Sequence, residues 1–263
     1  MSEIISYFGA EATGKTTLGF TAIKAFLDGI LIHFDFDLGR DRAIWRFPKE
    51  LQGRIKSVKF REVPTWTLGS GAITQRWAEF ERVYEMALND PQVRVLFLDT
   101  ASQVQILNAN EYLENYVMRN NPKRHQLVQI EYRMPNDRMR AKYMAAREAE
   151  KLLIISHKEQ PVYAEQFTQQ HDGSVKKESV NTGQKTFAGW GETPYMADQH
   201  LQLVFKNVNV DGNGKELQPV RLVTYAKFLK PNPPMIYGVE VVSPTYERLV
   251  QVIESIRKAS MVE

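Results

Sequence analysis

The sequence predicts an α/β fold: a mostly parallel sheet with helices on both faces, followed by antiparallel strands near the C-terminus. Short, largely apolar runs alternate with stretches of helical spacing over residues 4–156, which is typical of parallel strands joined by crossover helices. A glycine-rich turn joins the first run to the first helical stretch. Beyond residue 200, β-rich runs are separated by turn signals, which indicates antiparallel edge strands.

The elements follow in chain order. Apolar and β-branched runs predict strands at 4–8, 30–36, 93–98, 151–156, 201–205, 220–228 and 236–242. Apolar residues at helical spacing predict helices at 14–26, 74–88, 101–118 and 246–258. Turns are expected at 211–214 and 231–234, and the polar segment 158–192 is predicted to be a long, mobile loop. The 263 residues then divide into a core, 1–242, and a C-terminal helix within 243–263.

Composition excludes several classes of protein. Hydrophobic residues make up 43% and charged residues 25% of the chain, which is ordinary for a globular protein. The chain has no cysteine, so disulfides, thiol nucleophiles and cysteine zinc sites are excluded, which fits a reducing compartment. No apolar run approaches the length of a membrane span, and no basic signal-peptide region precedes the first strand. We therefore expect a cytoplasmic protein without a membrane partner.

The net charge of +3 conceals two basic segments. Residues 40–61 contain eight Lys or Arg against two acids, and residues 119–147 contain eight against two. These segments could face a polyanion such as nucleic acid, or they could be solvated helix surfaces, and both interpretations stay open.

Residues 9–16 match the phosphate-binding pattern G-x-x-x-x-G-K-[ST] at every fixed position, between a predicted strand and a predicted helix. Glycines allow successive backbone N–H groups to converge on phosphate oxygens. Lys15 would bridge the β- and γ-phosphates, and the Thr16 hydroxyl would bind Mg²⁺. The residues expected to hold the nucleotide are Gly9, Ala10, Glu11, Ala12, Thr13, Gly14, Lys15, Thr16 and Thr17.

Asp99 ends the apolar run VLFLD, as the second carboxylate signature of nucleotide hydrolases does, where the carboxylate holds the metal through water. The predicted metal residues are therefore Thr16 and Asp99, and the predicted cofactors are ATP and Mg²⁺. The lack of an N-K-x-D segment disfavours GTP. Hydrolysis, phosphoryl transfer and binding alone all remain open at this point.

The segments GAEATGKTTL (9–18) and HFDFDLGRDRA (33–43) resemble the RecA family of recombinase ATPases. The shared features are a Glu at the third loop position, a doubled Thr after the lysine, and a second strand that ends in spaced carboxylates. Overall size and the segment LIISHKEQ (153–160) are similar to the compact RecA-like ATPases that bacteriophages encode for recombination and annealing. The resemblance implies a RecA-like P-loop NTPase core.

The family's catalytic Glu, which activates the attacking water, falls on Asp37, and Asp35 is the competing candidate. A carboxylate on a strand adjacent to the phosphate loop is suited to polarise water. Both residues could instead only end the strand. Asp41 and the Ile44-Trp45 pair resemble the family's base-contacting region, with Trp45 in the core as the alternative.

Further roles follow from the same resemblance. His157 stands where the family places a polar γ-phosphate sensor, and a structural histidine is the alternative. The segment 158–192 matches the second DNA-binding loop, and 119–147, which includes Tyr132, overlaps the first. The lysines of the second loop are Lys176, Lys177 and Lys185.

Lys227 and Lys230 match family lysines that reach the γ-phosphate of a neighbouring subunit, or they are ordinary exposed lysines of an edge strand. Only eight residues precede the loop, so we do not expect filament formation through the N-terminal segment by which larger recombinases dock on one another. Assembly would then depend on the C-terminal helix, DNA or a partner.

The function expected from the sequence is a Mg²⁺-ATP-dependent, single-stranded-DNA-binding ATPase that assists homologous recombination or annealing. Its expected partners are single-stranded DNA, further copies of the chain and an annealing or single-strand-binding protein, in a phage-infected cytoplasm. One alternative is a P-loop kinase for a nucleoside or small metabolite, with Arg133, Arg138, Arg140 and Arg147 as a phosphate-binding lid. Another is a nucleotide-gated scaffold that does not hydrolyse its ligand.

Overall fold

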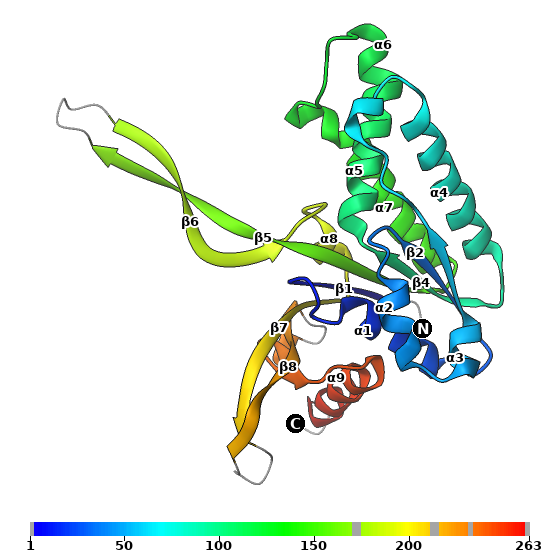
Figure 1. Cartoon of the computed structure of the whole chain (residues 1–263), viewed down its shortest axis with the longest axis vertical. Helices are drawn as coiled ribbons and strands as arrows, with labels where there is room; N and C mark the ends of the chain where they lie inside the picture. The colour runs from blue at the N-terminus through cyan, green and yellow to red at the C-terminus, as the bar shows by residue number, and fades with distance from the viewer. Residues whose placement is uncertain (1–2, 170–174, 211–215, 231–233, 261–263) are drawn as a thin grey trace.

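The computed structural model describes residues 3–169, 175–210, 216–230 and 234–260. Its strands share one mixed sheet, with helices above and below it and two hairpins that extend away from the body (Figure 1). The turn predicted at 211–214, and residues 231–233 of the other predicted turn, lie outside the described residues.

The sheet has the strand order β3-β2-β4-β5-β1-β7-β8-β9, with β6 paired to β5 alone. The strands from β3 to β7 in this order run parallel, whereas β8 and β9 are antiparallel to their neighbours. The bounds of the strands are β1 (Ile4–Gly9), β2 (Ile30–Asp35), β3 (Ile55–Lys59), β4 (Val93–Asp99), β5 (Leu152–Gln169), β6 (Val175–Phe187), β7 (Gln199–Val210), β8 (Glu216–Lys230) and β9 (Glu240–Val242).

Two helical layers cover the sheet and give it two hydrophobic cores. One layer consists of short elements near the phosphate loop together with the C-terminal helix: α1 (Lys15–Thr21), η1 (Ala22–Ala25), α2 (Arg40–Ala43), η2 (Ile44–Arg46), α3 (Lys49–Arg54) and α9 (Tyr246–Ser260). The other contains the long helices α4 (Ala72–Asn89), α5 (Ala101–Tyr112) and α7 (Arg133–Glu148). The predicted fold class, a mostly parallel sheet with helices on both faces and antiparallel strands near the C-terminus, is confirmed.

Strand β5 illustrates why apolar runs without polar alternation form the central strands. Leu152 and Ile154 belong to the core on the α1 side, whereas Leu153 and Ile155 belong to the core on the α4 side. Because successive side chains of a strand point to opposite faces, a strand covered by helices on both sides needs apolar residues at every position.

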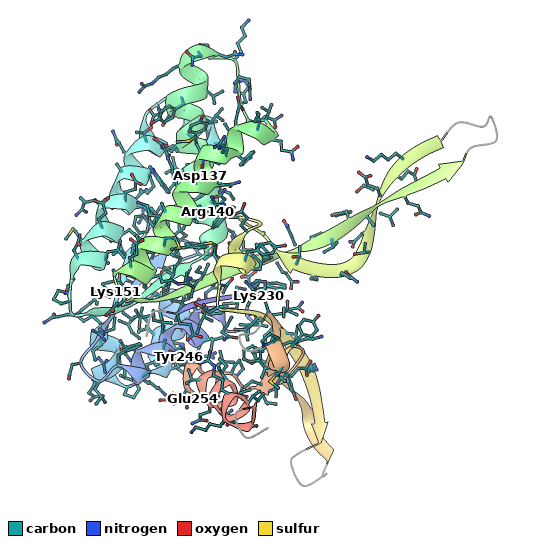
Figure 2. All side chains as sticks on the ribbon, turned by 180° about the vertical axis from the view of Figure 1, so that it is seen from behind. Asp137, Arg140, Lys151, Lys230, Tyr246 and Glu254 are labelled. Atoms are coloured by element: carbon teal, nitrogen blue, oxygen red, sulfur yellow. The ribbon has the colours of Figure 1, made fainter. Side chains whose placement is uncertain are left out.

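The segment predicted to be a long mobile loop is instead a hairpin of β5 and β6, which we call the arm (residues 158–169 and 175–187). Its strands pair antiparallel from Glu159 and Phe187 outward to Gln169 and Val175. The ribbon projects from the body with its side chains on both faces in the open, as Figure 2 shows. The prediction was wrong because the ribbon beyond its root at Phe187 does not pack on a core, so polar residues replace the hydrophobic alternation that normally indicates a strand.

Several boundaries also differ from the predicted ones. Strand β3 was not predicted, because its sequence IKSVK lies within the first basic segment. The helix predicted at 101–118 becomes π-helical at Leu113–Val117 (η4), then continues as α6 (Met118–Asn120). The strand predicted at 236–242 is only β9, preceded by the 3₁₀ turn η6 (Pro234–Ile236). The remaining short elements are η3 (Thr65–Thr67), η5 (Gln129–Tyr132) and α8 (Thr193–Met196).

Glu114, in η4 just after α5, binds the start of α4. Its carboxylate accepts backbone N–H bonds from Gly69 (2.8 Å), Gly71 (3.1 Å) and Thr74 (3.1 Å), and the Thr74 hydroxyl donates to it at 2.6 Å. Burial acts to raise the pKa of Glu114, but these hydrogen bonds outweigh it and hold the pKa below its ordinary value. The carboxylate therefore satisfies donors that a helix start leaves unpaired.

Candidate functional site: a phosphate-loop pocket

The phosphate loop runs from the end of β1 at Gly9 to the start of α1 at Lys15. Ala12 and Gly14 adopt positive φ angles of 65° and 85°, and these turns bring the chain into the helix. A Cβ on Gly9 would stand 2.5 Å from the Leu203 carbonyl oxygen, because β7 passes close behind the loop. Local geometry therefore requires both fixed glycines of the pattern: Gly14 forms a left-handed turn, and Gly9 leaves room for the close approach of the β7 backbone.

Lys15 lies folded back on its own loop. Its ammonium donates to the carbonyl oxygens of Gly9 (2.8 Å) and Ala10 (2.7 Å). Burial lowers the pKa of Lys15, while Asp99 and Asp37 act in the opposite direction. A phosphate oxygen is a charged acceptor, and charge-assisted hydrogen bonds are roughly twice as strong as neutral ones. The lysine is therefore placed to exchange carbonyl acceptors for phosphate.

Thr16 and Asp99 lie 83 residues apart in the sequence and meet at the pocket. The Thr16 hydroxyl donates to Asp99 Oδ2 at 2.6 Å, His33 Nε2 lies 3.3 Å from the same oxygen, and the Ser156 hydroxyl donates to Oδ1. Burial acts to raise the pKa of Asp99, but His33 and the two hydroxyls outweigh it, so the pKa lies below its ordinary value. The buried carboxylate is ionised next to the hydroxyl predicted to bind metal.

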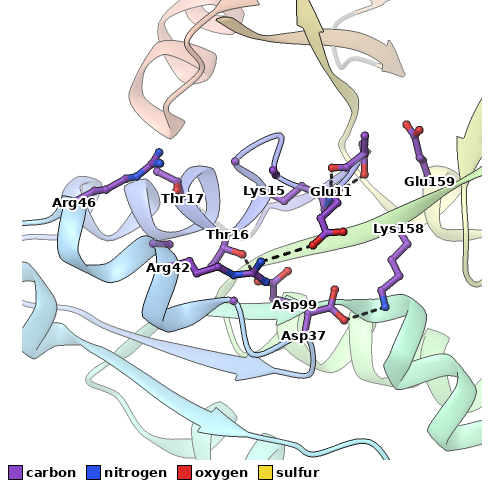
Figure 3. A pocket seen from close by; sticks show the side chains of 16 residues that line it. Glu11, Lys15, Thr16, Thr17, Asp37, Arg42, Arg46, Asp99, Lys158 and Glu159 are labelled. Carbon is purple, nitrogen blue, oxygen red and sulfur yellow. Dashed lines mark hydrogen bonds and ion pairs between the residues drawn. The ribbon is translucent and has the colours of Figure 1, made fainter. Parts of the chain in front are cut away.

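These residues face an open pocket of about 630 Å³, within the range usual for small-ligand sites (Figure 3). It is lined by Gly9, Ala10, Glu11, Ala12, Gly14, Lys15, Thr16, Thr17, Asp37, Gly39, Arg42, Ala43, Arg46, Asp99, Lys158 and Glu159. In the described residues, no three His, Asp or Glu side chains gather closely enough to hold a metal by themselves. This donor set fits Mg²⁺, which usually keeps several waters and takes one or two protein oxygens plus phosphate.

Asp37 and Asp35 have different surroundings. Asp37 lines the pocket, and its Oδ1 lies 3.1 Å from the ammonium of Lys158. Asp35 is fully buried and accepts backbone N–H bonds from Gly39 (2.9 Å) and Arg40 (3.4 Å). Strand β2 does not pair with β1, since β4 and β5 lie between them. Asp37 reaches the pocket because all these parallel strands end at the same edge of the sheet.

The pocket includes charged residues that sequence reasoning did not assign. Arg42 lies 3.7 Å from Glu11 of the phosphate loop, so an ion pair spans the pocket (Figure 3). Arg46, one helical turn later, also lines a neighbouring pocket of about 310 Å³. Lys158 and Glu159 enter from the root of the arm. The i, i+4 spacing of Arg42 and Arg46, soon after the carboxylates that follow β2, was a sequence pattern that could have indicated their shared position at the pocket.

The predicted base-contacting residues do not line the phosphate pocket. Asp41 is paired with Lys59 at 2.9 Å, and this contact lowers the pKa of Asp41. Trp45 is 68% exposed, not part of the core, and the Arg46 guanidinium lies 5.4 Å from the centre of its ring.

His157 is fully buried and does not line the pocket. Its Nδ1 lies 3.1 Å from the Ala188 carbonyl oxygen, and its Nε2 has no hydrogen-bond partner among the described residues. Burial, together with the nearby His200, lowers the pKa of His157 to about 3. The ring is therefore neutral, packed against Phe187 at the root of the arm.

Neither Lys227 nor Lys230 lines the phosphate pocket of its own chain. The Lys230 ammonium donates to the carbonyl oxygens of Tyr195 (3.0 Å), Ala197 (3.3 Å) and Pro194, and so satisfies the end of α8. Lys227 is half-buried on β8, opposite Gln202 and Glu240 in the ladder.

Comparison with solved structures found several similar folds. A KaiC-like protein from the archaeon Pyrococcus horikoshii OT3 is 12% identical, with a TM-score of 0.46 over 91% of this chain and 84% of that one. The RadB recombinase is 12% identical, with a TM-score of 0.48 over 91% and 86%. A type III secretion ATPase from pathogenic bacteria is 13% identical, with a TM-score of 0.44 over 78% and 52%. No protein-family model matches the chain, and no curated protein matches it in sequence.

Most bases of the segment 119–147 are neutralised within the chain. Six of the eight lie against carboxylates: Arg124 with Glu131, Arg133 with Asp137, Arg138 with Glu111, Arg140 with Asp137 and Glu192, Lys142 with Glu81, and Arg147 with Asp198. Asp137 and Arg140 are labelled on α7 in Figure 2. Among the described residues, only Arg119 and Lys123 of this segment have no carboxylate partner.

The segment 40–61 divides into several local roles. Arg42 and Arg46 line the pocket, Arg40 and Lys59 share Asp41, and Arg54 donates to carbonyl oxygens around 23–29. The lysines of the arm are also paired, each with a glutamate: Lys176 with Glu178, Lys177 with Glu165, and Lys185 with Glu159. Across the described ranges, none of the helices combines the length and apolarity needed to cross a membrane.

Proposed function

We propose that the chain is a Mg²⁺-dependent ATP hydrolase that acts on or with single-stranded DNA. The observation that carries the hydrolase is the convergence of Lys15, the Thr16–Asp99 pair and Asp37 on one pocket. Lys15 would hold the β- and γ-phosphates, Thr16 and Asp99 the metal, and Asp37 the attacking water. A bound Mg²⁺ would supply charge neutralisation at the phosphates.

The base and ribose are proposed to enter the neighbouring pocket. That pocket shares Gly14, Thr17 and Arg46 with the phosphate pocket, so one extended ligand can occupy both. Its lining combines apolar Leu203 and Pro244 with polar groups, which suits a nucleobase.

Hydrolysis is tested by phosphate release from ATP with Mg²⁺, in the presence and absence of single-stranded DNA. Replacing Lys15 by Ala is expected to abolish turnover while the thermal unfolding midpoint stays near that of the unmodified chain. DNA-independent turnover under conditions where DNA binds would contradict the coupling of the two activities. Lack of phosphate release with every nucleic acid would instead favour the nucleotide-gated scaffold.

For DNA we propose the end of the long helices around α6. Arg119 and Lys123 there have no carboxylate partner within the part of the chain that the structure describes, and Tyr116 and Tyr132 are 51% and 39% exposed. Cations that neutralise phosphates, beside rings on which bases stack, suit single strands. The exposed arm projects elsewhere (Figure 1) and would offer a separate surface, on which each lysine is paired with a carboxylate in the described residues.

The salt dependence of DNA affinity tests this assignment. Each phosphate neutralised on a single strand contributes about −0.7 to the slope of log K against log salt concentration. Two cations give a slope of about −1.4, whereas participation of all eight bases of 119–147 would give about −5.6. A steep slope would show that the ion pairs open on binding, and a slope near zero would remove the DNA proposal.

The kinase alternative is not favoured. None of the arginines assigned to its phosphate lid lines the pocket, and all four lie against carboxylates outside it: Arg133, Arg138, Arg140 and Arg147. Observed transfer of the γ-phosphate from ATP to a nucleoside would restore the kinase hypothesis.

A further inference from the structure

His33 lies fully buried inside the central sheet. It belongs to β2, and its ring is held between Phe20 of α1, edge-on with ring centres 4.9 Å apart, and Phe97 of β4, stacked at 5.0 Å. Its Nδ1 lies 3.0 Å from the Ser57 hydroxyl of β3, and its Nε2 lies 3.3 Å from Asp99 Oδ2. The imidazole therefore connects the edge strand of the sheet to the carboxylate at the end of β4.

The charge of Asp99 determines which nitrogen of His33 carries a hydrogen. Although burial acts to raise the pKa of Asp99, its hydrogen bonds hold the pKa below the ordinary value, so the carboxylate is ionised and can only accept hydrogen bonds. His33 Nε2 must then carry a hydrogen and donate it to Oδ2. In the neutral ring this leaves Nδ1 to accept the Ser57 hydroxyl, so Ser57 selects the tautomer that Asp99 requires.

The two strands that flank β4 each supply one donor to Asp99. His33 of β2 donates to Oδ2, and the Ser156 hydroxyl of β5 donates to Oδ1. Thr16 comes from the phosphate loop and also donates to Oδ2 (Figure 3). Thr16 and Asp99 line the pocket, whereas His33 and Ser156 do not. A ligand that draws the Thr16 hydroxyl away from Asp99 would therefore leave Oδ2 to His33, the other donor to this oxygen among the described residues.

We propose that His33 is a positioning residue for the metal, which keeps the Asp99 carboxylate facing Thr16 when the Thr16 hydroxyl turns from Asp99 to Mg²⁺. The inference rests on the proposed Mg²⁺-nucleotide site and adds to it a residue that lies outside the pocket. Mg²⁺ sites require near-ideal octahedral geometry, so the direction of the Asp99 oxygen matters as well as its charge. Without the Nε2–H of His33, Oδ2 would lose the donor that keeps it in place.

The test measures affinity for a non-hydrolysable ATP analogue by isothermal titration, over a series of free Mg²⁺ concentrations and in EDTA. His33→Phe keeps a ring between Phe20 and Phe97 but removes both ring nitrogens. Loss of a residue that orients a metal-binding group typically weakens a metal site about 10- to 100-fold, so the Mg²⁺ concentration at the midpoint of the affinity gain should rise by about this factor. Affinity for the analogue in EDTA should stay unchanged.

Two further variants separate positioning from packing. His33→Gln can place an amide N–H near the position of Nε2 and is expected to restore most of the Mg²⁺ response. Ser57→Ala removes the hydroxyl that selects the tautomer, so it should shift the Mg²⁺ midpoint in the same direction as His33→Phe and by a smaller factor. Because Ser57 is half-buried on an edge strand, this variant decides the question if His33→Phe does not fold.

His200→Phe is the matched control. His200 is also a buried histidine of the sheet, its ring stacks on Phe8 with centres 5.5 Å apart, and its Nδ1 lies 3.2 Å from the Ser6 hydroxyl. It does not line the pocket. Because each variant removes a buried hydrogen bond between a histidine and a serine, the urea midpoint is expected to fall in both His33→Phe and His200→Phe. The Mg²⁺ midpoint is expected to shift in His33→Phe and to stay unchanged in His200→Phe.

Three results decide against the inference or the site on which it rests. An unchanged Mg²⁺ midpoint in His33→Phe, or in Ser57→Ala where His33→Phe does not fold, would overturn the role of His33. A shift of equal size in His200→Phe would overturn it as well, because a general loss of packing would then explain the effect. If the unmodified chain bound the analogue equally well in Mg²⁺ and in EDTA, the metal site of the proposed function would itself fail, and this result is visible without any variant.

Discussion

Gly39 approaches the Thr16–Asp99 pair more closely than a side chain would allow. A Cβ at this position would stand 2.8 Å from Thr16 Oγ1 and 3.6 Å from Asp99 Oδ2. The φ angle of Gly39 is −79°, so alanine is compatible with the backbone, and its N–H can still donate to Asp35. Gly39→Ala therefore disturbs the Thr16 hydroxyl while leaving the loop in place.

The expected loss of nucleotide affinity follows from the hydrogen bond between Thr16 and Asp99 that Gly39→Ala breaks. The added methyl must push the Thr16 hydroxyl away from its 2.6 Å contact with Asp99. A hydrogen bond to a charged group contributes roughly 1.5–3 kcal/mol, which corresponds to about 10- to 150-fold in affinity. We expect Gly39→Ala to weaken nucleotide binding by this factor with Mg²⁺ and to leave binding in EDTA unchanged.

Isothermal titration with an ATP analogue, once in Mg²⁺ and once in EDTA, measures the nucleotide affinity of the same protein with and without the metal. Gly53→Ala is the control, because a Cβ at Gly53 meets nothing within 4 Å. Gly53 lies within α3, so its replacement should leave binding unchanged and raise stability by up to about 1 kcal/mol. If Gly39→Ala kept the full gain in affinity from Mg²⁺, the assignment of Thr16 and Asp99 to the metal would be refuted.

Three further predictions concern the helices and β8. Since Glu114 has a lowered pKa in the fold, Glu114→Gln should cost about 2 kcal/mol at pH 7, and urea unfolding should show this deficit shrinking as the pH falls through the ordinary carboxyl value of 4.5. Arg138→Met removes the only cation paired with the buried Glu111 in the described residues and leaves it with the Asn115 amide, so its urea midpoint should fall by the equivalent of about 3 kcal/mol, and an unchanged midpoint would contradict this. Lys227→Ala should reduce turnover only in assembled protein without changing the thermal midpoint, whereas Lys230→Ala should lower that midpoint. Equal effects of the two β8 variants would contradict a role across an interface.

The sequence was sufficient to predict the central sheet and the phosphate loop, because each depends on local physical constraints. Strands such as β4 and β5 are buried on both faces, so their apolar runs have few alternative structures. The loop pattern at 9–16 specifies backbone turns that few residue types permit. Asp99 could be placed beside the loop because a carboxylate at the end of such a strand lies at the edge of the sheet where the loop begins.

The residues that were missed depend on long-range placement. Lys158 and Arg42 reach the pocket because the arm root and the helix after β2 happen to end at the same sheet edge, which no local pattern encodes. His157 illustrates the converse: its neighbour in sequence points into the pocket, while it points into the protein, since successive residues of a strand face opposite ways. A shift of one residue along the strand therefore decides whether a side chain lines the pocket or lies in the core.

Clusters of charged residues in the sequence were the least reliable guide to where a ligand binds, and the pocket illustrates the reason. Its lining contains four cations (Lys15, Arg42, Arg46 and Lys158) and four carboxylates (Glu11, Asp37, Asp99 and Glu159), so it is formally neutral. A neutral pocket does not attract a polyphosphate by net charge, and two of its cations are already paired with carboxylates across it. Binding must therefore exchange ion-pair partners, and a ligand that arrives with Mg²⁺ brings less excess charge into the site than a free polyphosphate.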